Sequence, residues 1–179
     1  MAVSDDIVGP VPAGADPDEY DRLRRRVLWA MPAGLYLVGS AAGDELNLMT
    51  ANWAMQVSAT PKLLAISVEV GALTHRLVAE GGAFSLCILK REDRPVVRRF
   101  AKPAVWDPEA STLHGEPVWL GRKRLPVLVS AAAWLDCDVR HRLDFDSHSL
   151  FVGEVVQCGA VDELDEILRM EDTRMSYGG

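Results

Sequence analysis

The sequence predicts a mainly β protein, a small antiparallel barrel with flanking helices. From Leu35 onward, short runs rich in β-branched and aliphatic residues are separated by turn residues, which is typical of strands joined by hairpins. Strands do not alternate with long helical patterns, so parallel βαβ units are not expected. Closing the sheet into a barrel removes the exposed edge strands that promote aggregation.

Length and composition indicate one folded domain. The chain has 179 residues, of which 49% are hydrophobic and 25% charged, enough apolar material for one core. Residues 1–15, rich in Pro and Gly, are expected to form a flexible arm, and residues 16–179 a single domain with a C-terminal tail. The formal net charge of -7 argues against nucleic-acid binding, which needs a basic face.

Helix signals occur at three places. Asp16, Pro17 and Glu19 form a helix-start signature, and the helix is expected to run to about Ala30. Thr74 is placed to cap a short helix that stops at Gly81–Gly82. Residues 91–103 are predicted to form another helix, with Arg98 and Arg99 pointing outward.

Strands are expected over six segments. They are LYLVGS, LNLMTANWAMQVSA, KLLAISVEV, AFSLCIL, PVLVSAAAWLDCDV and LFVGEVVQCGAV. Within residues 134–139, Leu135, Cys137 and Val139 alternate with Asp136 and Asp138, which predicts a half-exposed strand. A turn over residues 143–149 joins the last two segments, and residues 104–125 are expected to be an irregular excursion.

The three cysteines, Cys87, Cys137 and Cys158, lie far apart without a CxxC pair. Each stands in an apolar run, so we interpret all three as small buried hydrophobic residues without chemistry. Unpaired cysteines indicate a reduced intracellular compartment. The acidic N-terminus lacks the features of a signal peptide, and no apolar run is long enough to span a bilayer. A soluble, cytoplasmic protein with no membrane partner is therefore expected.

The common catalytic motifs are missing, which makes P-loop kinases, Rossmann dehydrogenases, zincins and α/β-hydrolases poor candidates. The four histidines are not spaced as a metal cluster, so no metal is expected. What remains is a run of small and polar residues, 50–61, inside strand-like sequence. Such a surface fits a planar heterocycle whose edge accepts and donates hydrogen bonds. The alternative is a barrel strand with a solvated polar face.

The order of motifs in residues 46–89 resembles the flavin reductase-like, FMN-binding split-barrel family. The shared features are a T-x-N segment, an S-x-x-P turn, a T-H pair opening a helix, and a G-x-F strand. Asp146-Ser147-His148 before LFVGEVV is similar to the family's later D-H-x-L-F-x-G-E-V hairpin, and Phe100-Ala101 to the end of its middle helix. The resemblance covers roughly residues 30 to 160. It implies an antiparallel Greek-key barrel that binds FMN, with FAD as the alternative.

Site residues follow from this resemblance alone. His148 would lie over the flavin as the catalytic residue, orienting a nicotinamide or relaying a proton. The resemblance implies the following cofactor-binding residues: Thr50, Ala51, Asn52 and Trp53 at the ring edge; Ser58 and Ala59 near the ribityl and phosphate; Thr74 and His75 as an anion site at a helix start; and Lys90 and Arg91 neutralising phosphate.

Several of these roles have a simpler alternative. Thr74 is alternatively only a helix cap, and Lys90 and Arg91 only surface charges. His148 is alternatively a turn residue in water, and Trp53 a core or dimer anchor.

The activity implied is that of an NAD(P)H-dependent flavin reductase. NADH or NADPH would supply the hydride, and reduced flavin would pass to a monooxygenase or another electron acceptor. A homodimer with flavin at the subunit interface is expected. Two alternatives stay open: a flavin-binding electron-transfer module without its own NAD(P)H site, and a binding protein that has lost turnover.

Overall fold

The computed structural model describes residues 9–161, 164, 166–173 and 175, and the chain divides into two compact units. The smaller unit comprises residues 1–32 and 174–179, and the larger one residues 33–173. The smaller unit contains α1 (Pro17–Trp29), where Asp16 Oδ1 accepts a hydrogen bond from the Glu19 amide at 2.9 Å. The helix predicted from this cap is confirmed. Residues 1–8 of the expected arm lie outside the described residues, and the domain boundary at residue 16 stays a prediction.

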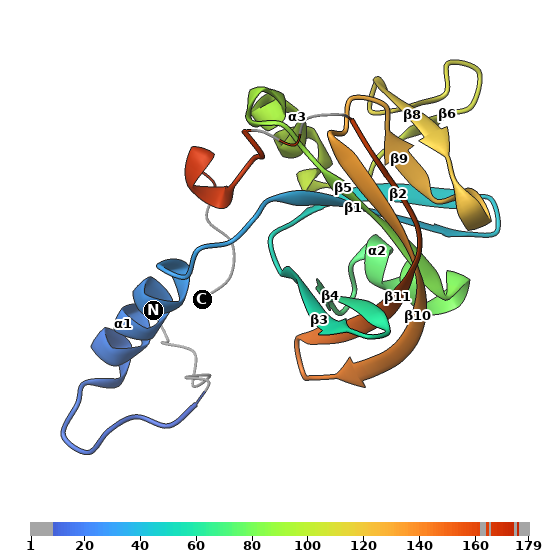
Figure 1. Ribbon diagram of the computed structural model, residues 1–179. Helices are drawn as coiled ribbons and strands as arrows, with labels where there is room; N and C mark the ends of the chain where they lie inside the picture. Colours follow the sequence, from blue (N-terminus) through green and yellow to red (C-terminus); the bar gives the residue numbers. More distant parts are fainter. Residues whose placement is uncertain (1–8, 162–163, 165, 174, 176–179) are drawn as a thin grey trace. The chain divides into compact units, whose positions relative to one another are not determined.

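The larger unit is built on a seven-stranded antiparallel sheet in the order β2-β1-β5-β10-β11-β4-β3 (Figure 1). Its strands in chain order are β1 (Tyr36–Ala42), β2 (Glu45–Ala51), β3 (Ala54–Ala59), β4 (Lys62–Glu69), β5 (Ala83–Ile88), β10 (Ala133–Asp144) and β11 (His148–Ala160). Every pairing within it is antiparallel, as expected.

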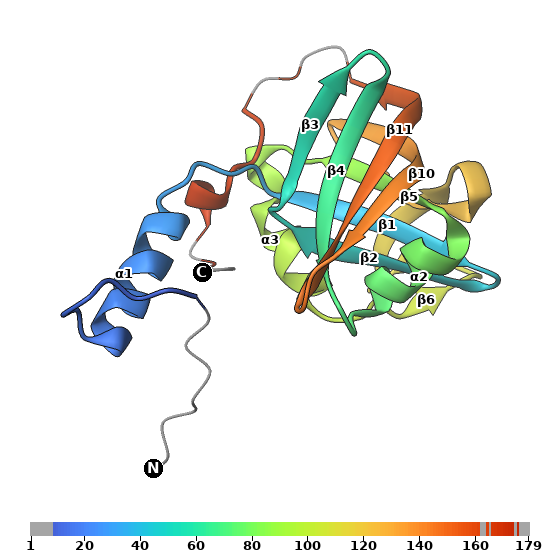
Figure 2. The ribbon, with the colours of Figure 1, turned by 90° about the horizontal axis from the view of Figure 1, so that it is seen from below.

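The two edges of this sheet, β2 and β3, are consecutive in the chain and joined only by Asn52 and Trp53. The sheet therefore curls until its edges approach at that point, as Figures 1 and 2 show. Register shifts between Asp136 and Cys137 and between Val139 and His141 mark one bulge in β11, at Val156, and one in β10, at Arg140; such bulges help long strands to bend around a barrel. The segment LNLMTANWAMQVSA, predicted as one strand, is thus two strands that change direction at the Asn52–Trp53 link.

The barrel interior is filled by alternate residues of the curled strands. Ala54, Ile66 and Phe151 occupy one row of neighbouring positions across β3, β4 and β11, and Ile66 and Phe151 are buried in the core. Phe84 on β5 is fully buried in the same cluster. Residues one position along each strand point to the opposite face of the sheet.

Helix α2 (Leu73–Gly81) crosses one end of the barrel and packs mainly on β1. Gly82 ends it in a left-handed conformation at φ 63°, as the Gly81–Gly82 pair predicted. The predicted cap is wrong: Ala72 holds the N-cap position, and Thr74 lies inside the helix with a fully buried side chain. Thr74 Oγ1 instead accepts a hydrogen bond from Asn47 Nδ2 of β2 at 2.9 Å.

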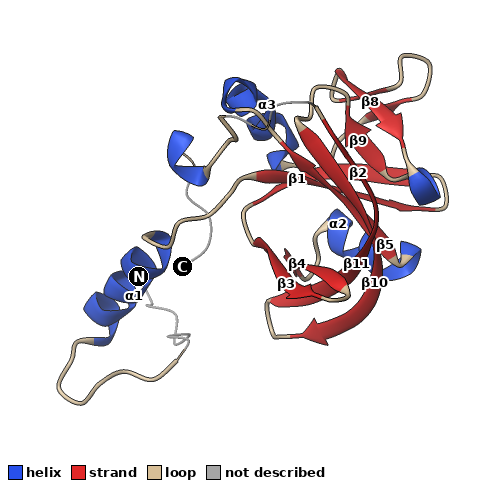
Figure 3. Cartoon of the chain, in the orientation of Figure 1, coloured by secondary structure: helices blue, strands red, loops and turns tan. Residues whose placement is uncertain are grey.

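The helix predicted over 91–103 is a series of short turns: η1 (Arg91–Asp93), α3 (Arg94–Val97) and η2 (Arg98–Ala101). Residues 104–125 are more regular than predicted (Figure 3). They form β6 (Trp106–Asp107), β7 (Thr112–Leu113), β8 (Glu116–Leu120) and η3 (Arg122–Arg124), and with β9 (Pro126–Leu128) these strands make a second, four-stranded sheet. The predicted strand over 126–139 is therefore divided between the two sheets.

Two burial predictions need correction. Asp136 was expected on an exposed face, but it is buried because η3 covers that side of β10, and its Oδ2 accepts a hydrogen bond from the Arg122 amide at 3.2 Å. Burial raises the pKa of this carboxyl. Cys158 is exposed, whereas burial raises the pKa of the Cys87 and Cys137 thiols to about 12, which keeps both protonated and unreactive. The reduced, cytoplasmic compartment stays a prediction.

The C-terminal segment returns to the barrel. Leu168 is fully buried, and its amide donates to the carbonyl of Leu89, while the Met170 amide donates to that of Ala33. The segment includes the short helical turn η4 (Met170–Asp172). None of the helices described has the length and apolar character needed to cross a bilayer.

Candidate functional site

Trp53 and His148 meet at the point where the two edges of the sheet approach each other. Trp53 lies in the link between β2 and β3, and its carbonyl accepts a hydrogen bond from the Ser67 amide of β4. His148 opens β11 and pairs with Glu69 of β4. The centroids of the two rings are 4.9 Å apart and their planes are inclined by 52°. Two residues 95 positions apart in the sequence are thus brought into contact.

Buried polar atoms beside these rings lack hydrogen-bond partners. Among the described residues, neither Asn52 Oδ1 nor His148 Nε2 has one, although both atoms are shielded from solvent. His148 Nδ1 lies 2.9 Å from Ser147 Oγ, so Nε2 is the ring nitrogen left for a ligand. Buried polar groups are normally paired, and an unpaired one costs about 1 to 3 kcal/mol. An acceptor and an imidazole nitrogen next to an indole fit a flat heterocycle with polar edges, such as a flavin.

Thr50 and Ala51, at the end of β2, are engaged by the protein itself. Thr50 Oγ1 donates a 2.5 Å hydrogen bond to the carbonyl of Val97 in α3. The Ala51 side chain is buried in the core cluster. Contact between these two residues and a ring edge would therefore fall mainly to their backbone groups, and that role stays a prediction.

Ser58 and Ala59 lie at the far end of β3, next to the turn into β4. A strand rises about 3.3 Å per residue, so Ser58 is roughly 16 Å along the chain from Trp53. The Ser58 carbonyl accepts a hydrogen bond from Gln56 Nε2, and that of Ala59 one from Lys62 Nζ. Their expected position beside the ribityl and phosphate stays a prediction.

Thr74 and His75, expected as an anion site, have side chains that bond within the barrel. His75 Nε2 lies 2.8 Å from Ser149 Oγ of β11, and its ring meets that of Phe151 edge-on, with centroids 5.4 Å apart. Burial, and then the charge of Arg142, lower the pKa of His75, while the Asp144 charge opposes this shift. The anion-binding role of both residues stays a prediction.

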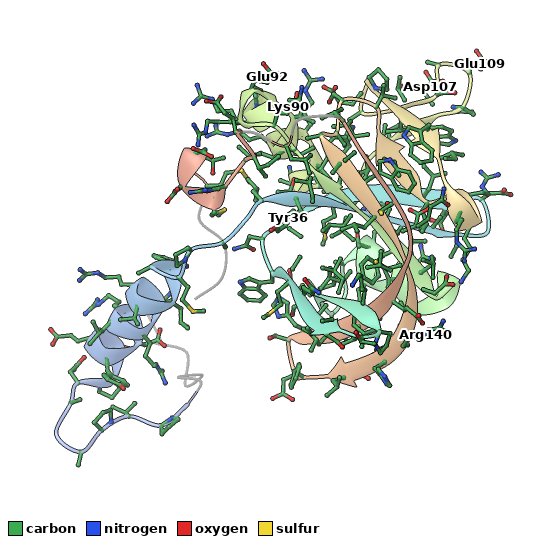
Figure 4. The ribbon with its side chains drawn as sticks, viewed as in Figure 1. Tyr36, Lys90, Glu92, Asp107, Glu109 and Arg140 are labelled. Carbon is green, nitrogen blue, oxygen red and sulfur yellow. The ribbon has the colours of Figure 1, made fainter. Side chains whose placement is uncertain are left out.

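Arg91 opens the η1 turn and Lys90 directly precedes it, at the end of the barrel near α3. Figure 4 labels Lys90 beside Glu92 there. Lys90 forms an isolated β-bridge with Ile167, and the Arg91 amide donates to the carbonyl of Glu166. Arg91 Nε also lies 3.0 Å from Asp172 Oδ1. A phosphate bound at Arg91 would have to compete with the Asp172 carboxylate for the guanidinium group. The phosphate-binding role of Lys90 and Arg91 stays a prediction.

Sequence reasoning missed two sets of polar residues that support the site. Asn47 bridges β2, α2 and the segment after η2, because its Nδ2 donates to Thr74 and its Oδ1 accepts from the Ala104 amide at 2.8 Å. Ser149 Oγ donates to Asp144 Oδ1 at 2.6 Å across the β10–β11 hairpin. The only signal in the sequence was a polar residue inside each apolar run.

Among the described residues, no three His, Cys, Asp or Glu side chains gather into a metal-ligand group. Residues 28–178 match the family model described as the flavin reductase like domain. The chain belongs to the flavin reductase-like family.

Two curated relatives illustrate the range of this flavin reductase-like family. The NADH-dependent flavin reductase StyB of Pseudomonas fluorescens is 30% identical over 115 residues, which cover 64% of each chain. The high molecular weight rubredoxin of Moorella thermoacetica is 26% identical over 138 residues, 76% of this chain and 59% of the relative. The match extends over as little as 25% of the length of another relative, a diflavin flavoprotein of Synechocystis, so this chain corresponds to only part of several longer proteins.

Solved structures of flavin reductase-like proteins confirm the predicted split-barrel fold. The NADH:FAD oxidoreductase SgcE6 of Streptomyces globisporus superposes with a TM-score of 0.68 at 28% identity, covering 87% of this chain and 85% of SgcE6. BorF, the flavin reductase component of a bacterial two-component tryptophan halogenase, has a TM-score of 0.68 at 27% identity, covering 79% of this chain and 88% of BorF.

Proposed function

We propose that this protein is an NADH-dependent flavin reductase that supplies reduced flavin to a partner oxygenase. The observation that carries the proposal is the contact of Trp53 with His148, beside two buried polar atoms without partners in the described structure, in a member of the flavin reductase-like family. The similarity to StyB and SgcE6 supports NADH as the reductant. The similarity to BorF, the reductase component of a two-component halogenase, supports a separate partner enzyme as the acceptor.

A bound flavin supplies the hydride acceptor, and the protein supplies position and hydrogen bonds. In this proposal, the Trp53 indole covers one end of the ring and excludes water, and the Asn52 side chain accepts a hydrogen bond from the ring edge. His148 holds its ring through Ser147 and directs Nε2 to the nicotinamide. Positioning of this kind lowers the barrier by fixing the two reactants in one geometry.

Anaerobic mixing with NADH tests the proposal directly. The purified protein with flavin is mixed with NADH in the absence of oxygen, and the loss of flavin absorbance is followed. Rapid bleaching is expected, faster than with free flavin and NADH alone. Mass analysis of the chromophore released from the purified protein identifies it as FMN or FAD. A rate equal to that of the protein-free mixture would contradict the reductase assignment.

A second candidate is an electron-transfer module without an NADH site. The match to a high molecular weight rubredoxin favours it, since the name of that relative indicates an electron-transfer protein. This candidate predicts that flavin binds but NADH does not bleach it, whereas a chemical reductant or reduced rubredoxin does. The same anaerobic experiment therefore separates the two functions.

Replacing Asn52 with leucine is expected to weaken flavin binding. The change removes the side-chain acceptor and leaves its partner on the ring unpaired, which costs about 1 to 3 kcal/mol, or roughly 5- to 150-fold in Kd. Fluorescence titration with FMN and FAD measures the loss. The matched control is Asn47→Leu, which removes a buried amide from β2, the strand that precedes Asn52, and is expected to lower stability. Unchanged flavin affinity of the Asn52 variant would rule out this segment as the flavin platform.

We also propose a homodimer, joined through the outer face of β3. Trp53, Met55 and Val57 are exposed on this edge strand, Met55 by 65%. Met55 pairs with Ala65 of β4, which pairs with Val152 of β11, but both of these partners are buried, so the exposed apolar surface is formed by β3 and the Trp53 link. A contiguous exposed apolar surface of this kind is typical of a protein interface. Because Trp53 is part of this surface, the flavin would lie where the two subunits meet.

The variant Met55→Glu is expected to convert this dimer to monomers. A carboxylate in the centre of an apolar interface loses its hydration without gaining a partner. Light scattering at micromolar concentration should give twice the 19.6 kDa chain mass for the parent and the single chain mass for the variant. The control Val129→Glu changes an exposed valine outside β3 and the Trp53 link and should leave the dimer intact. A monomeric parent with flavin bound would refute the proposal.

A further inference from the structure

A chain of hydrogen bonds connects the start of α2 to the hairpin that carries His148. His75 Nε2 lies 2.8 Å from Ser149 Oγ, and Ser149 Oγ lies 2.6 Å from Asp144 Oδ1. Arg142 Nε donates to the same carboxylate oxygen at 2.6 Å. The chain therefore runs from the helix, across β11, to the end of β10.

The direction of each hydrogen bond follows from the proton count. The Ser149 hydroxyl has one proton, and it is donated to Asp144, which as a carboxylate only accepts. Ser149 must then accept from His75, so Nε2 of the imidazole carries a proton. The hydrogen bonds from Ser149 and Arg142 hold the pKa of Asp144 below its usual value, which keeps the acceptor ionised. The donor and acceptor assignments are thus consistent along the whole series of hydrogen bonds.

This series of hydrogen bonds holds the turn next to the candidate site in place. Asp144 and Ser149 are cross-strand partners on either side of residues 145–148, and Ser149 directly follows His148. Ser149 pairs with Val68, a core residue, whereas His148 pairs with Glu69 and so points to the opposite face, where Trp53 lies. The hydrogen bonds of the Ser149 side chain, which faces the inside of the barrel, therefore fix the backbone next to His148. That backbone in turn orients the His148 ring on the outer face.

We propose that His75, acting through Ser149, is a positioning residue that sets the orientation of His148. The inference rests on the proposed function, in which His148 contacts the nicotinamide. The sequence resemblance implied a phosphate-binding role for His75, whereas the hydrogen bond to Ser149 assigns it to holding the hairpin. The start of α2 thus acts on the reaction indirectly, through a buried serine.

The test combines Ser149→Ala with His148→Ala in a double-mutant cycle. Ser149→Ala is expected to slow reduction of bound flavin by NADH about 10-fold through misplacement of His148, with flavin Kd unchanged. In the His148→Ala background, the same change should have no further effect on the rate, because its target is gone. The control Ser85→Ala removes another fully buried hydroxyl, bonded to the Pro126 carbonyl at 2.8 Å, and should keep the parent rate.

Two kinetic results overturn the proposal: a parent rate for Ser149→Ala, or equal rate losses with and without His148. Hydrogen exchange of the amides of residues 145–149, measured without flavin or NADH, gives a readout independent of activity. Ser149→Ala should raise this exchange at least several-fold while Ser85→Ala leaves it unchanged. If NADH fails to reduce the parent protein, the proposed function fails, and the exchange result still decides whether these hydrogen bonds hold the turn in place.

Discussion

Replacing His148 with alanine is expected to slow flavin reduction by NADH about 100-fold, the lower end of what a positioned acid or base contributes. His148 Nε2 is buried without a partner among the described residues, and Ser147 engages the other ring nitrogen. The side chain is thus prepared to bond one more group beside Trp53. Its removal leaves Asn52 and Trp53 in place, so flavin Kd should change little.

Stopped-flow reduction under anaerobic conditions at saturating flavin measures this effect. The matched control is His141→Ala, which removes an exposed histidine from β10 of the same hairpin and should keep the parent rate. A parent rate for His148→Ala would show that His148 is only a turn residue. A loss of flavin affinity equal to the loss of rate would instead assign His148 to cofactor binding.

Replacing Phe84 with alanine is expected to lower the free energy of unfolding by about 3 to 5 kcal/mol. Phe84 is fully buried on β5, a strand paired on both sides by β1 and β10. Its ring lies where Gly153 of β11 has no side chain: a Cβ at Gly153 would lie 2.7 Å from Phe84 Cε1. Removal of the ring would therefore leave a cavity that the surrounding strands could fill only by bending.

Urea unfolding at a fixed chain concentration measures this loss, because the proposed dimer would make the apparent stability depend on concentration. The control Phe145→Ala deletes the same ring from an exposed turn position and should change the free energy of unfolding by less than about 1 kcal/mol. Equal losses for the two variants would contradict the assignment of Phe84 to the core.

Local signals in the sequence were sufficient for much of the secondary structure. Asp16 caps α1 because its carboxylate reaches an amide three residues away, and Gly82 ends α2 because it adopts the left-handed conformation that this position requires. Both effects act within one turn of the chain, so neither depends on the rest of the fold. The order of motifs, recognised as that of the flavin reductase-like family, implied the barrel itself.

Only the tertiary structure decided which polar side chains are buried and which partners they bond. Asp136 follows the alternation of an exposed strand, yet η3 covers it, and no local pattern reports which segment packs on which face. Thr74 has the residue type of a helix cap, but a bond to Asn47, 27 residues earlier, places it inside the barrel.

The candidate site shows the same division. The sequence by itself determined the fold class, most of the strands and the motif residues Asn52, Trp53 and His148. The contact of Trp53 with His148, and the bonds from His75 through Ser149 to Asp144, were decided by strand register and by the approach of the two sheet edges. Register depends on pairing between segments distant in sequence, and a shift of one residue would turn every side chain of β11 to the opposite face.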